Sequence, residues 1–277
     1  MPRSRARRVE LVRQYYRTYD EWNRLVKDPY HRLELDTTLH FLEKYLPARG
    51  ELLDVGGGPG RYTIELARRG YSISFVDFTP ENVERARRNV QRAGVSRQVS
   101  RILVGSATDL SEFADGTFDG VLCLGGALNH ILTARGRDRA AKELARVARA
   151  GAPVFVSVIS RYAQLIDGLV LHPDGFRVDP QHHWRILRTG NYDGHRGFAP
   201  SHFFSPDELI HLLERQGLKV LETAGLQGLA AGRHETVNRL SRADPEAWKS
   251  WWKFHLATCT DPSVVATSQH FLAVTQK

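Results

Sequence analysis

The chain has 277 residues, of which 42% are hydrophobic and 25% charged, so a fibrous or largely disordered protein is excluded and one large domain is expected. The net charge of +8 raises the question of nucleic acid. Because the basic residues are mostly arginine and, apart from the segment Pro2–Arg8, are spread along the chain, a nucleic-acid partner is not the first expectation.

Helices and strands are predicted in a regular order. Residues 9–46 are predicted to be helical and aromatic, with a break at Asp28-Pro29, and we interpret 1–46 as a helical cap. From Glu51 onward, short apolar runs alternate with helical segments, which is typical of βαβ units and a parallel sheet. The apolar runs are Leu52–Val55, Ser72–Val76, Val99–Val104, Gly120–Leu124 and Val154–Val158. The helical segments between them are Arg61–Arg69, Pro80–Ala93 and Arg137–Ala148.

The last third of the chain continues this pattern with interruptions. Ser205 is the predicted N-cap of a helix that has Pro206 at its first position, and Leu218–Thr223 and His270–Thr275 are predicted as a sixth and a seventh strand. The stretches 160–204 and 226–265 fit neither period. We interpret them as substrate-side insertions into a single domain, 1–277, whose cofactor-binding core spans 47–160.

The turn after the first predicted strand contains Gly56, Gly57, Gly58 and Gly60 and follows Asp54. Glycine is costly to order, so this density indicates that a ligand approaches the backbone closely. A dinucleotide fingerprint needs glycine at the first, third and sixth positions, and the sixth position counted from Gly56 is Arg61. Asp54 would repel a phosphate, and we expect it to accept hydrogen bonds from the turn amides or from a ligand ammonium.

Three more polar turns follow the next strands. Asp77 ends the second strand 17 residues after Gly60, where an acidic side chain can hold the two hydroxyls of a ribose, and Phe78 beside it would flank an adenine. Ser106 and Ala107 lie in a turn suited to the adenine edge. The fourth turn runs from Leu124 to His130 and would open onto a reaction centre.

In this order and spacing, residues 50–160 resemble the class I S-adenosylmethionine-dependent methyltransferases, most closely the small-molecule branch of types 11 and 25. The resemblance implies an α/β, Rossmann-like fold with a seven-stranded, mostly parallel sheet of order 3-2-1-4-5-7-6 and an antiparallel last strand. It implies an enzyme that uses S-adenosylmethionine, without a metal, to methylate N, O or S of a small molecule. We expect a monomer or a homodimer.

The resemblance also implies roles for individual residues. The expected cofactor contacts are Asp54, Gly56, Gly57, Gly58, Gly60, Asp77, Phe78, Ser106, Ala107 and Leu124. Many relatives carry Asp where Ser106 stands, so Asp109 or a backbone carbonyl would replace that contact. The expected substrate-side residues are Tyr16, Trp22, Arg24, Asn129 and His130. His130 is the candidate catalytic residue, and Arg24 would either clamp a carboxylate or be solvated.

Other interpretations stay open. An RNA methyltransferase would carry Asn/Asp-Pro-Pro-Tyr/Phe after the fourth strand, where Leu124-Gly-Gly-Ala stands. A non-catalytic cofactor-binding protein is a second alternative, and a nicotinamide-dependent oxidoreductase a more distant third. The histidines at 182 and 183 are interpreted as surface residues and the tryptophans at 248, 251 and 252 as core packing.

Composition also bears on the compartment. Cys123 and Cys259 lie far apart without CxxC spacing, so neither a disulfide framework nor a thiolate metal site is expected. No apolar stretch approaches the roughly 18 residues of a membrane-spanning helix. The amino-terminal segment is too charged for the apolar part of a signal peptide. We therefore expect a soluble, cytoplasmic protein without a membrane partner.

Overall fold

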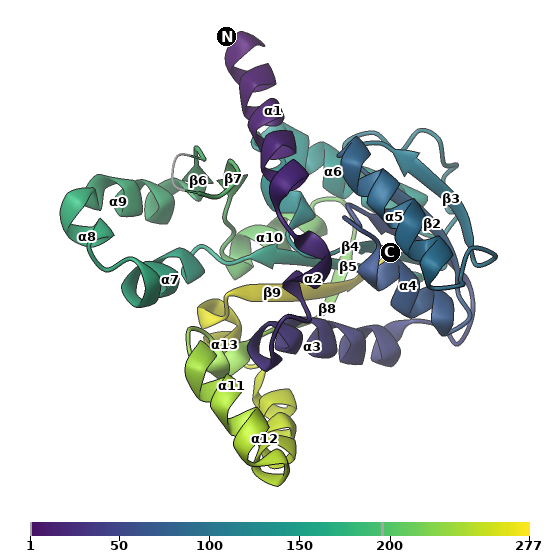
Figure 1. The fold of residues 1–277 in the computed structure, drawn as a ribbon. Coiled ribbons are helices and arrows are strands. Elements are labelled where there is room, and N and C mark those ends of the chain that lie inside the picture. Colours follow the sequence, from purple (N-terminus) through teal and green to yellow (C-terminus); the bar gives the residue numbers. More distant parts are fainter. Residues whose placement is uncertain (1, 195–196) are drawn as a thin grey trace.

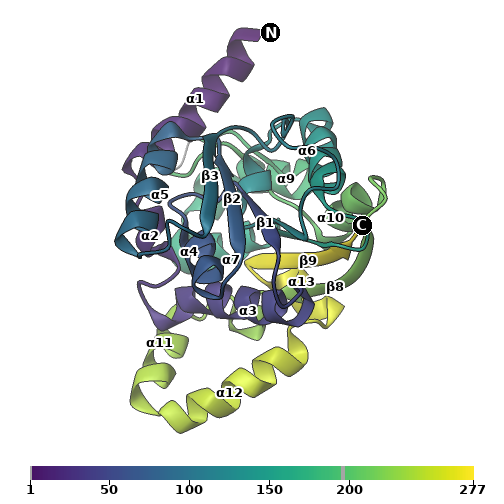
Figure 2. The same cartoon turned by 90° about the vertical axis from the view of Figure 1, so that its right-hand side faces the viewer.

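A seven-stranded sheet forms the centre of the computed structural model, which describes residues 2–194 and 197–277 (Figure 1). Its strands are β1 (Glu51–Val55), β2 (Ser72–Asp77), β3 (Val99–Val104), β4 (Gly120–Cys123), β5 (Pro153–Ile159), β8 (Lys219–Gly225) and β9 (His270–Gln276). They lie in the order β3-β2-β1-β4-β5-β9-β8, and Figure 2 shows β3, β2 and β1 side by side. The first five are parallel, and β9 runs antiparallel to β5 and β8. Since β8 and β9 are the sixth and seventh strands of this sheet, the predicted order is confirmed.

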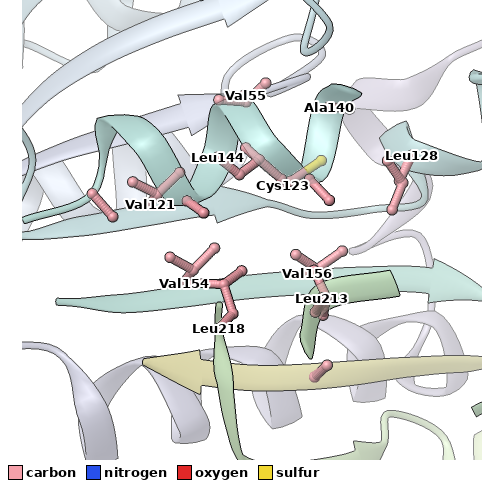
Figure 3. Close-up of a cluster of buried hydrophobic side chains, with 14 of the residues drawn as sticks. Val55, Val121, Cys123, Leu128, Ala140, Leu144, Val154, Val156, Leu213 and Leu218 are labelled. Atoms are coloured by element: carbon pink, nitrogen blue, oxygen red, sulfur yellow. The ribbon is translucent and has the colours of Figure 1, made fainter. Parts of the chain in front are cut away.

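Helices cover both faces of the sheet, as expected for parallel strands whose side chains alternate between two buried faces. On one face, Leu53 and Val55 pack with α6 (Ala134–Val147) and α10 (Pro206–Glu214), and Figure 3 shows part of this core. On the other face, Leu52 packs with α3 (Pro29–Tyr45) and α4 (Arg61–Arg68). Helix α5 (Pro80–Arg92) covers β2 and β3 through Val83 and Ala86.

The predicted amino-terminal cap has two parts. Helices α1 (Pro2–Thr18) and α2 (Glu21–Arg24) lie near the ends of β1 and β2, whereas α3 belongs to the helical layer on the sheet. The break between them lies where it was predicted. The Asp28 carboxylate caps α3 by accepting a hydrogen bond from the His31 amide at 2.9 Å, and Pro29 occupies the first helical position.

Both insertions are mainly helical, and they lie where β5 ends and β9 begins (Figure 1). The first contains α7 (Ala163–Leu171), α8 (Gly175–Val178), α9 (Pro180–Thr189), β6 (Asn191–Tyr192) and β7 (Ser201–His202). The second contains η2 (Gly228–Ala230), α11 (His234–Ala243), α12 (Pro245–Thr258) and α13 (Pro262–Thr267). Residues 195–196 of the first insertion lie outside the described residues.

The structure decides three local predictions. Ser205 caps α10 by accepting a hydrogen bond from the Glu208 amide, as expected. The tryptophans of α12 pack against a cluster that includes Tyr30 and Val237, so their packing role is confirmed. The surface assignment of His182 is wrong, because this ring is buried in α9 against Tyr192.

Two features of the described residues bear on partners. Among them, no helix combines the length and the apolar character that crossing a membrane requires. The same residues contain no group of three or more His, Cys, Asp or Glu side chains arranged to hold a metal ion.

Candidate active site

The glycine turn joins β1 to α4 in a conformation that leaves no room for a Cβ at Gly56 or Gly57. Gly56 has a φ of +74°, and a Cβ on it would lie 2.4 Å from the Cβ of Ala127. A Cβ on Gly57 would lie 2.5 Å from the Phe75 ring. Gly60 is the N-cap of α4 and packs against α5. The turn therefore presents bare backbone to the space above the sheet.

Two adjoining cavities lie beside this turn. The first is lined by Tyr16, Glu21, Arg24, Asp54, Gly56–Pro59, Arg61, Asp77, Phe78, Asn82 and Leu124, among others. The second is lined by Gly105–Thr108 and Ile131–Thr133, among others. Both share Val12, Gly56, Phe78, Ala127 and His130. Most of the predicted site residues thus come together at the carboxyl ends of β1, β2 and β4.

Asp54 is buried beneath the turn with one oxygen in use. Its Oδ2 accepts a hydrogen bond of 2.6 Å from the Thr63 hydroxyl. Its Oδ1 has no partner among the residues that the structure describes. Burial raises the pKa of Asp54 to about 6 despite the Thr63 bond. The expected bonds from the turn amides are not its partners, since the Gly58 amide donates to Asp77 instead.

Asp77 ties the end of β2 to the glycine turn. Its Oδ2 accepts from the Gly58 amide at 2.9 Å, and its Oδ1 accepts from the Thr79 amide at 2.7 Å. Burial raises the pKa of Asp77 to about 6, although the hydrogen bonds from the Thr79 and Gly58 amides favour its charge. Sequence reasoning missed Asn82. The sequence signal that could have found it is its polar side chain on the apolar face of α5, next to Val83.

The residues that were predicted to contact an adenine line the second cavity. Phe78 lines both cavities, and the Arg13 guanidinium lies 4.4 Å from the centre of its ring. Ser106 and Ala107 line the second cavity. Asp109 does not take the place of the missing acid, because it is exposed and its carboxylate accepts a hydrogen bond from the Ser111 amide. A backbone carbonyl therefore remains the predicted replacement for the Asp that many relatives carry at the position of Ser106.

The Arg24 side chain is only 12% exposed and is paired with two glutamates, so its interpretation as a solvated residue is wrong. Its Nε donates to Glu21 at 2.7 Å, and its two terminal nitrogens donate to both oxygens of Glu34 at 2.7 and 2.9 Å. Burial alone favours the neutral acid, but the Arg24 guanidinium lowers the pKa of Glu34 to about 2. A Cβ on Gly125 would lie 3.3 Å from Arg24 Nη2. The arginine therefore faces the end of β4 as a fixed cation.

Trp22 and Asn129 have structural contacts. The Trp22 ring packs beneath the Arg61 guanidinium at 4.1 Å, and its carbonyl accepts from Arg61 Nε at 3.1 Å. Asn129 is fully buried, and its side-chain amide donates to the His202 carbonyl at 2.7 Å while its oxygen accepts from the Ile159 amide at 3.0 Å. Neither residue belongs to the lining of the two described cavities. Asn129 instead holds the turn that carries His130.

His130 and Tyr16 form a hydrogen-bonded pair at the junction of the cavities. His130 Nδ1 lies 3.1 Å from the Pro200 carbonyl, so this nitrogen carries the proton and donates it. His130 Nε2 is therefore an acceptor, and the Tyr16 hydroxyl donates to it at 2.7 Å. Burial lowers the pKa of His130 to about 4 and raises that of Tyr16 far above its usual range. The pair is uncharged at neutral pH.

Comparison with known proteins bears on this arrangement. The family described as "Methyltransferase domain" matches residues 52–151, from within β1 to just before β5. A ubiquinone biosynthesis O-methyltransferase from Xanthomonas axonopodis pv. citri is 27% identical over 198 residues, 72% of this chain and 74% of that one. A glycine/sarcosine N-methyltransferase from Parasynechococcus marenigrum is 29% identical over 154 residues, which are 54% of this chain and 51% of that one. The structure of a methyltransferase from Methanosarcina mazei shares the fold, with a TM-score of 0.57 and 20% identity. The match covers 86% of this chain and 96% of that one.

These comparisons support a class I S-adenosylmethionine-dependent methyltransferase. The charges in the first cavity suit S-adenosylmethionine. Glu21, Asp54 and Asp77 line it together with Arg24 and Arg61, so acids outnumber bases. S-adenosylmethionine carries an ammonium, a sulfonium and a carboxylate, and it is a net cation. The unpartnered Asp54 Oδ1 is an acceptor of the kind that its ammonium or hydroxyl groups require.

Proposed function

We propose that the methyltransferase transfers a methyl group from S-adenosylmethionine, by in-line displacement, to N, O or S of a small molecule. The observation that carries this proposal is the buried Asp54 carboxylate, with one oxygen unpartnered among the described residues, beneath the bare backbone of Gly56–Gly58. The named relatives support a small acceptor, since one is a ubiquinone biosynthesis enzyme and the other acts on glycine and sarcosine.

Each end of the cofactor has residues suited to it. Asp54 would receive the ammonium, and Arg24 would face the carboxylate from α2. Asp77 would bind the ribose. The adenine would lie by Phe78, Ser106 and Ala107, and the methyl group by Leu124. These assignments follow the two adjoining cavities from the methionine side to the adenine side.

The cofactor supplies a methyl group on a positively charged sulfur, whose product is a neutral thioether. The protein therefore needs no strong acid, and its main work is to hold the acceptor in line and to exclude water. Orientation of this kind contributes up to roughly 7–11 kcal/mol to a lower barrier. Helices α1 and α2 supply Val12, Tyr16, Glu21 and Arg24 to the cavity wall, so they would enclose the reacting groups.

The Tyr16–His130 pair would handle a proton if the acceptor loses one. Because His130 Nε2 is occupied by the Tyr16 hydroxyl, a proton from the acceptor would reach the Tyr16 oxygen as Tyr16 passes its own proton to Nε2. With a pKa of about 4, His130 is a weak base at neutral pH. This favours acceptors that are nucleophilic without prior deprotonation.

The test is release of S-adenosylhomocysteine from S-adenosylmethionine, assayed against a panel of amines, phenols, thiols and carboxylates. We expect turnover with at least one class, and loss of turnover in Asp54→Asn. Cofactor binding without transfer to any member would favour the non-catalytic alternative. Transfer to RNA alone would favour the RNA methyltransferase.

A further inference from the structure

The turn that carries His130 is bonded to segment 200–202 of the first insertion. His130 Nδ1 donates to the Pro200 carbonyl at 3.1 Å. Beside it, the side-chain amide of Asn129 donates to the His202 carbonyl at 2.7 Å. Two consecutive side chains of the turn are therefore held by two carbonyls of one short segment.

The Pro200 carbonyl decides which nitrogen of His130 holds the proton. A carbonyl oxygen can only accept, so Nδ1 carries the hydrogen, and Nε2 is left to accept from the Tyr16 hydroxyl at 2.7 Å. In the other tautomer, Nε2 would itself donate to Tyr16, and the tyrosine could not pass a proton to it. The direction of the Tyr16–His130 bond thus depends on where segment 200–202 lies.

The side chain of His202 anchors this segment from the side opposite the turn. The residue is buried, its Nε2 donates to Glu208 Oε1 at 2.5 Å, and its Nδ1 lies 2.9 Å from Asn191 Oδ1. Glu208 Oε2 accepts from Arg161 Nη2 at 2.5 Å. An imidazole and a guanidinium of the first insertion therefore bind both oxygens of one carboxylate on α10.

The position of Glu208 in α10 makes this contact informative. Ser205 is the N-cap, and Glu208 is the third helical residue, where a glutamate commonly bonds back to the N-cap amide. The Ser205 hydroxyl accepts from the Glu208 amide, but the carboxylate is directed to His202 and Arg161. Because an ion pair withdrawn from water adds little net stability, fixing one conformation is the better-attested use of such a contact.

We infer that Glu208 and His202 are positioning residues for His130. They hold segment 200–202 so that its carbonyl meets His130 Nδ1, and Nε2 stays able to accept the proton that Tyr16 passes on. Neither side chain lines the two described cavities, so both act through the segment. The inference rests on the proposed function, and it places part of the proton path in an insertion that the family match does not reach.

The test is the tautomer of His130 in solution, read from nitrogen NMR spectra of protein labelled in histidine, with His130→Gln to assign the signal. We expect the wild type to show the Nδ1–H form. Glu208→Ala should lose part of this form to the Nε2–H form, because the Pro200 carbonyl is no longer held against Nδ1. Glu208→Gln keeps an acceptor for His202 and should restore the wild-type spectrum.

Two further variants complete the design. Asp207→Ala is the matched control, because it removes an exposed carboxylate from the same first turn of α10 and should leave the tautomer unchanged. His202→Phe removes the other partner of the contact and should repeat the change expected for Glu208→Ala, so it also serves if that variant does not fold. Both should keep the wild-type affinity for S-adenosylhomocysteine, measured by calorimetry.

Three outcomes would overturn the inference. The first is a wild type in the Nε2–H form. The second is an Nδ1–H signal that survives unchanged in Glu208→Ala and His202→Phe, since the segment then keeps its place without the contact. The third is an equal loss in Asp207→Ala, which would trace the effect to α10 in general. A tautomer that responds as expected, in a protein that methylates no member of the panel, would instead contradict the proposed function.

Discussion

Asp54 lies where the requirements of stability and of ligand binding oppose each other. The carboxylate is 1% exposed, and its only hydrogen bond among the described residues comes from the Thr63 hydroxyl. Burial raises its pKa to about 6, so ionisation at neutral pH costs the ligand-free protein free energy. A ligand ammonium would remove that cost. We therefore expect the affinity for the cofactor and the stability of the empty protein to change in opposite directions at this residue.

The first prediction concerns pH. A carboxyl whose folded-state pKa is raised contributes stability at low pH, and this is lost as the pH rises through about 6. Asp54→Asn should therefore raise the free energy of unfolding of the ligand-free protein at pH 8 by roughly 3 kcal/mol. In the wild type, the affinity for S-adenosylhomocysteine should fall as the pH drops below 6, measured by calorimetry. Equal affinities at pH 5.5 and pH 7.5 would contradict the role of Asp54.

The second prediction concerns the Tyr16–His130 pair. Tyr16→Phe leaves the half-buried His130 Nε2 without its donor at 2.7 Å, and the free energy of unfolding should fall by about 1–3 kcal/mol. Urea denaturation measures this effect. Tyr162→Phe, at an exposed position, is the control and should change little. If the two variants are equally stable, the hydrogen bond does not hold α1 to the turn that carries His130.

The positions of single residues in the fold could be predicted where a strand end, a glycine turn or a helix start lies next to them in the sequence. Asp54 and Asp77 end apolar runs next to a glycine turn or a helix start, so strand direction alone places them at one edge. Arg24 was misjudged because its burial depends on Glu34, ten positions away on another helix. Asn82 was missed since its unpartnered oxygen becomes visible only once α5 is packed on the sheet.

At the scale of elements, α1 reaches the site because α5 holds its end. Arg85 of α5 donates to the carbonyls of Tyr16 and Arg17 at 3.1 and 2.7 Å, near the end of α1 at Thr18. These are carbonyls of the last helical turn, which a cation stabilises. Arg17 also pairs with Glu81 of α5 at 2.7 Å. The position of Tyr16 in the cavity therefore depends on a contact between two helices.

The third prediction follows from this contact. Arg85→Ala should loosen α1, so amides around Tyr16 should exchange hydrogen faster, and S-adenosylhomocysteine should bind several-fold more weakly. Hydrogen exchange with mass spectrometry measures the first effect and calorimetry the second. Arg88→Ala changes an exposed arginine of the same helix and is the matched control. Faster exchange of α1 with unchanged affinity would show that α1 does not contribute to the cofactor site.

Elements were predictable wherever local periodicity determines them. The strands of the core and α4, α5 and α6 follow the apolar runs and helical segments of the sequence closely. The two insertions show no such period, because their helices are placed by contacts with distant residues. The α12 tryptophans, for example, pack on Tyr30 and Leu33 of α3. The split of the cap into α1, α2 and α3 also depends on which helix reaches the sheet.

At the scale of the whole molecule, the net charge of +8 comes from positive and negative side chains that are interspersed over the fold. Arginines pair with acids at sites far apart in the fold, such as Arg17 with Glu81 on α5 and Arg215 with Asp138 on α6. The first cavity is itself acidic on balance. Such interspersed pairs do not form the continuous basic stripe that nucleic-acid binding requires.

The fourth prediction is therefore that the protein does not bind bulk RNA at physiological salt. Fluorescence anisotropy with a labelled single-stranded RNA should show no binding tighter than about 10⁻⁴ M, the weak end of non-specific affinity. Weak binding at 50 mM salt is expected to come from the basic segment 2–8, and it should disappear when this segment is removed. The side chains of residues 2–6 lie outside the part of the chain that the structure describes. Tight binding that falls steeply between 50 and 200 mM salt and survives the truncation would favour the RNA methyltransferase instead. Because paired arginines release few counterions, we expect the truncated chain to give almost no salt dependence.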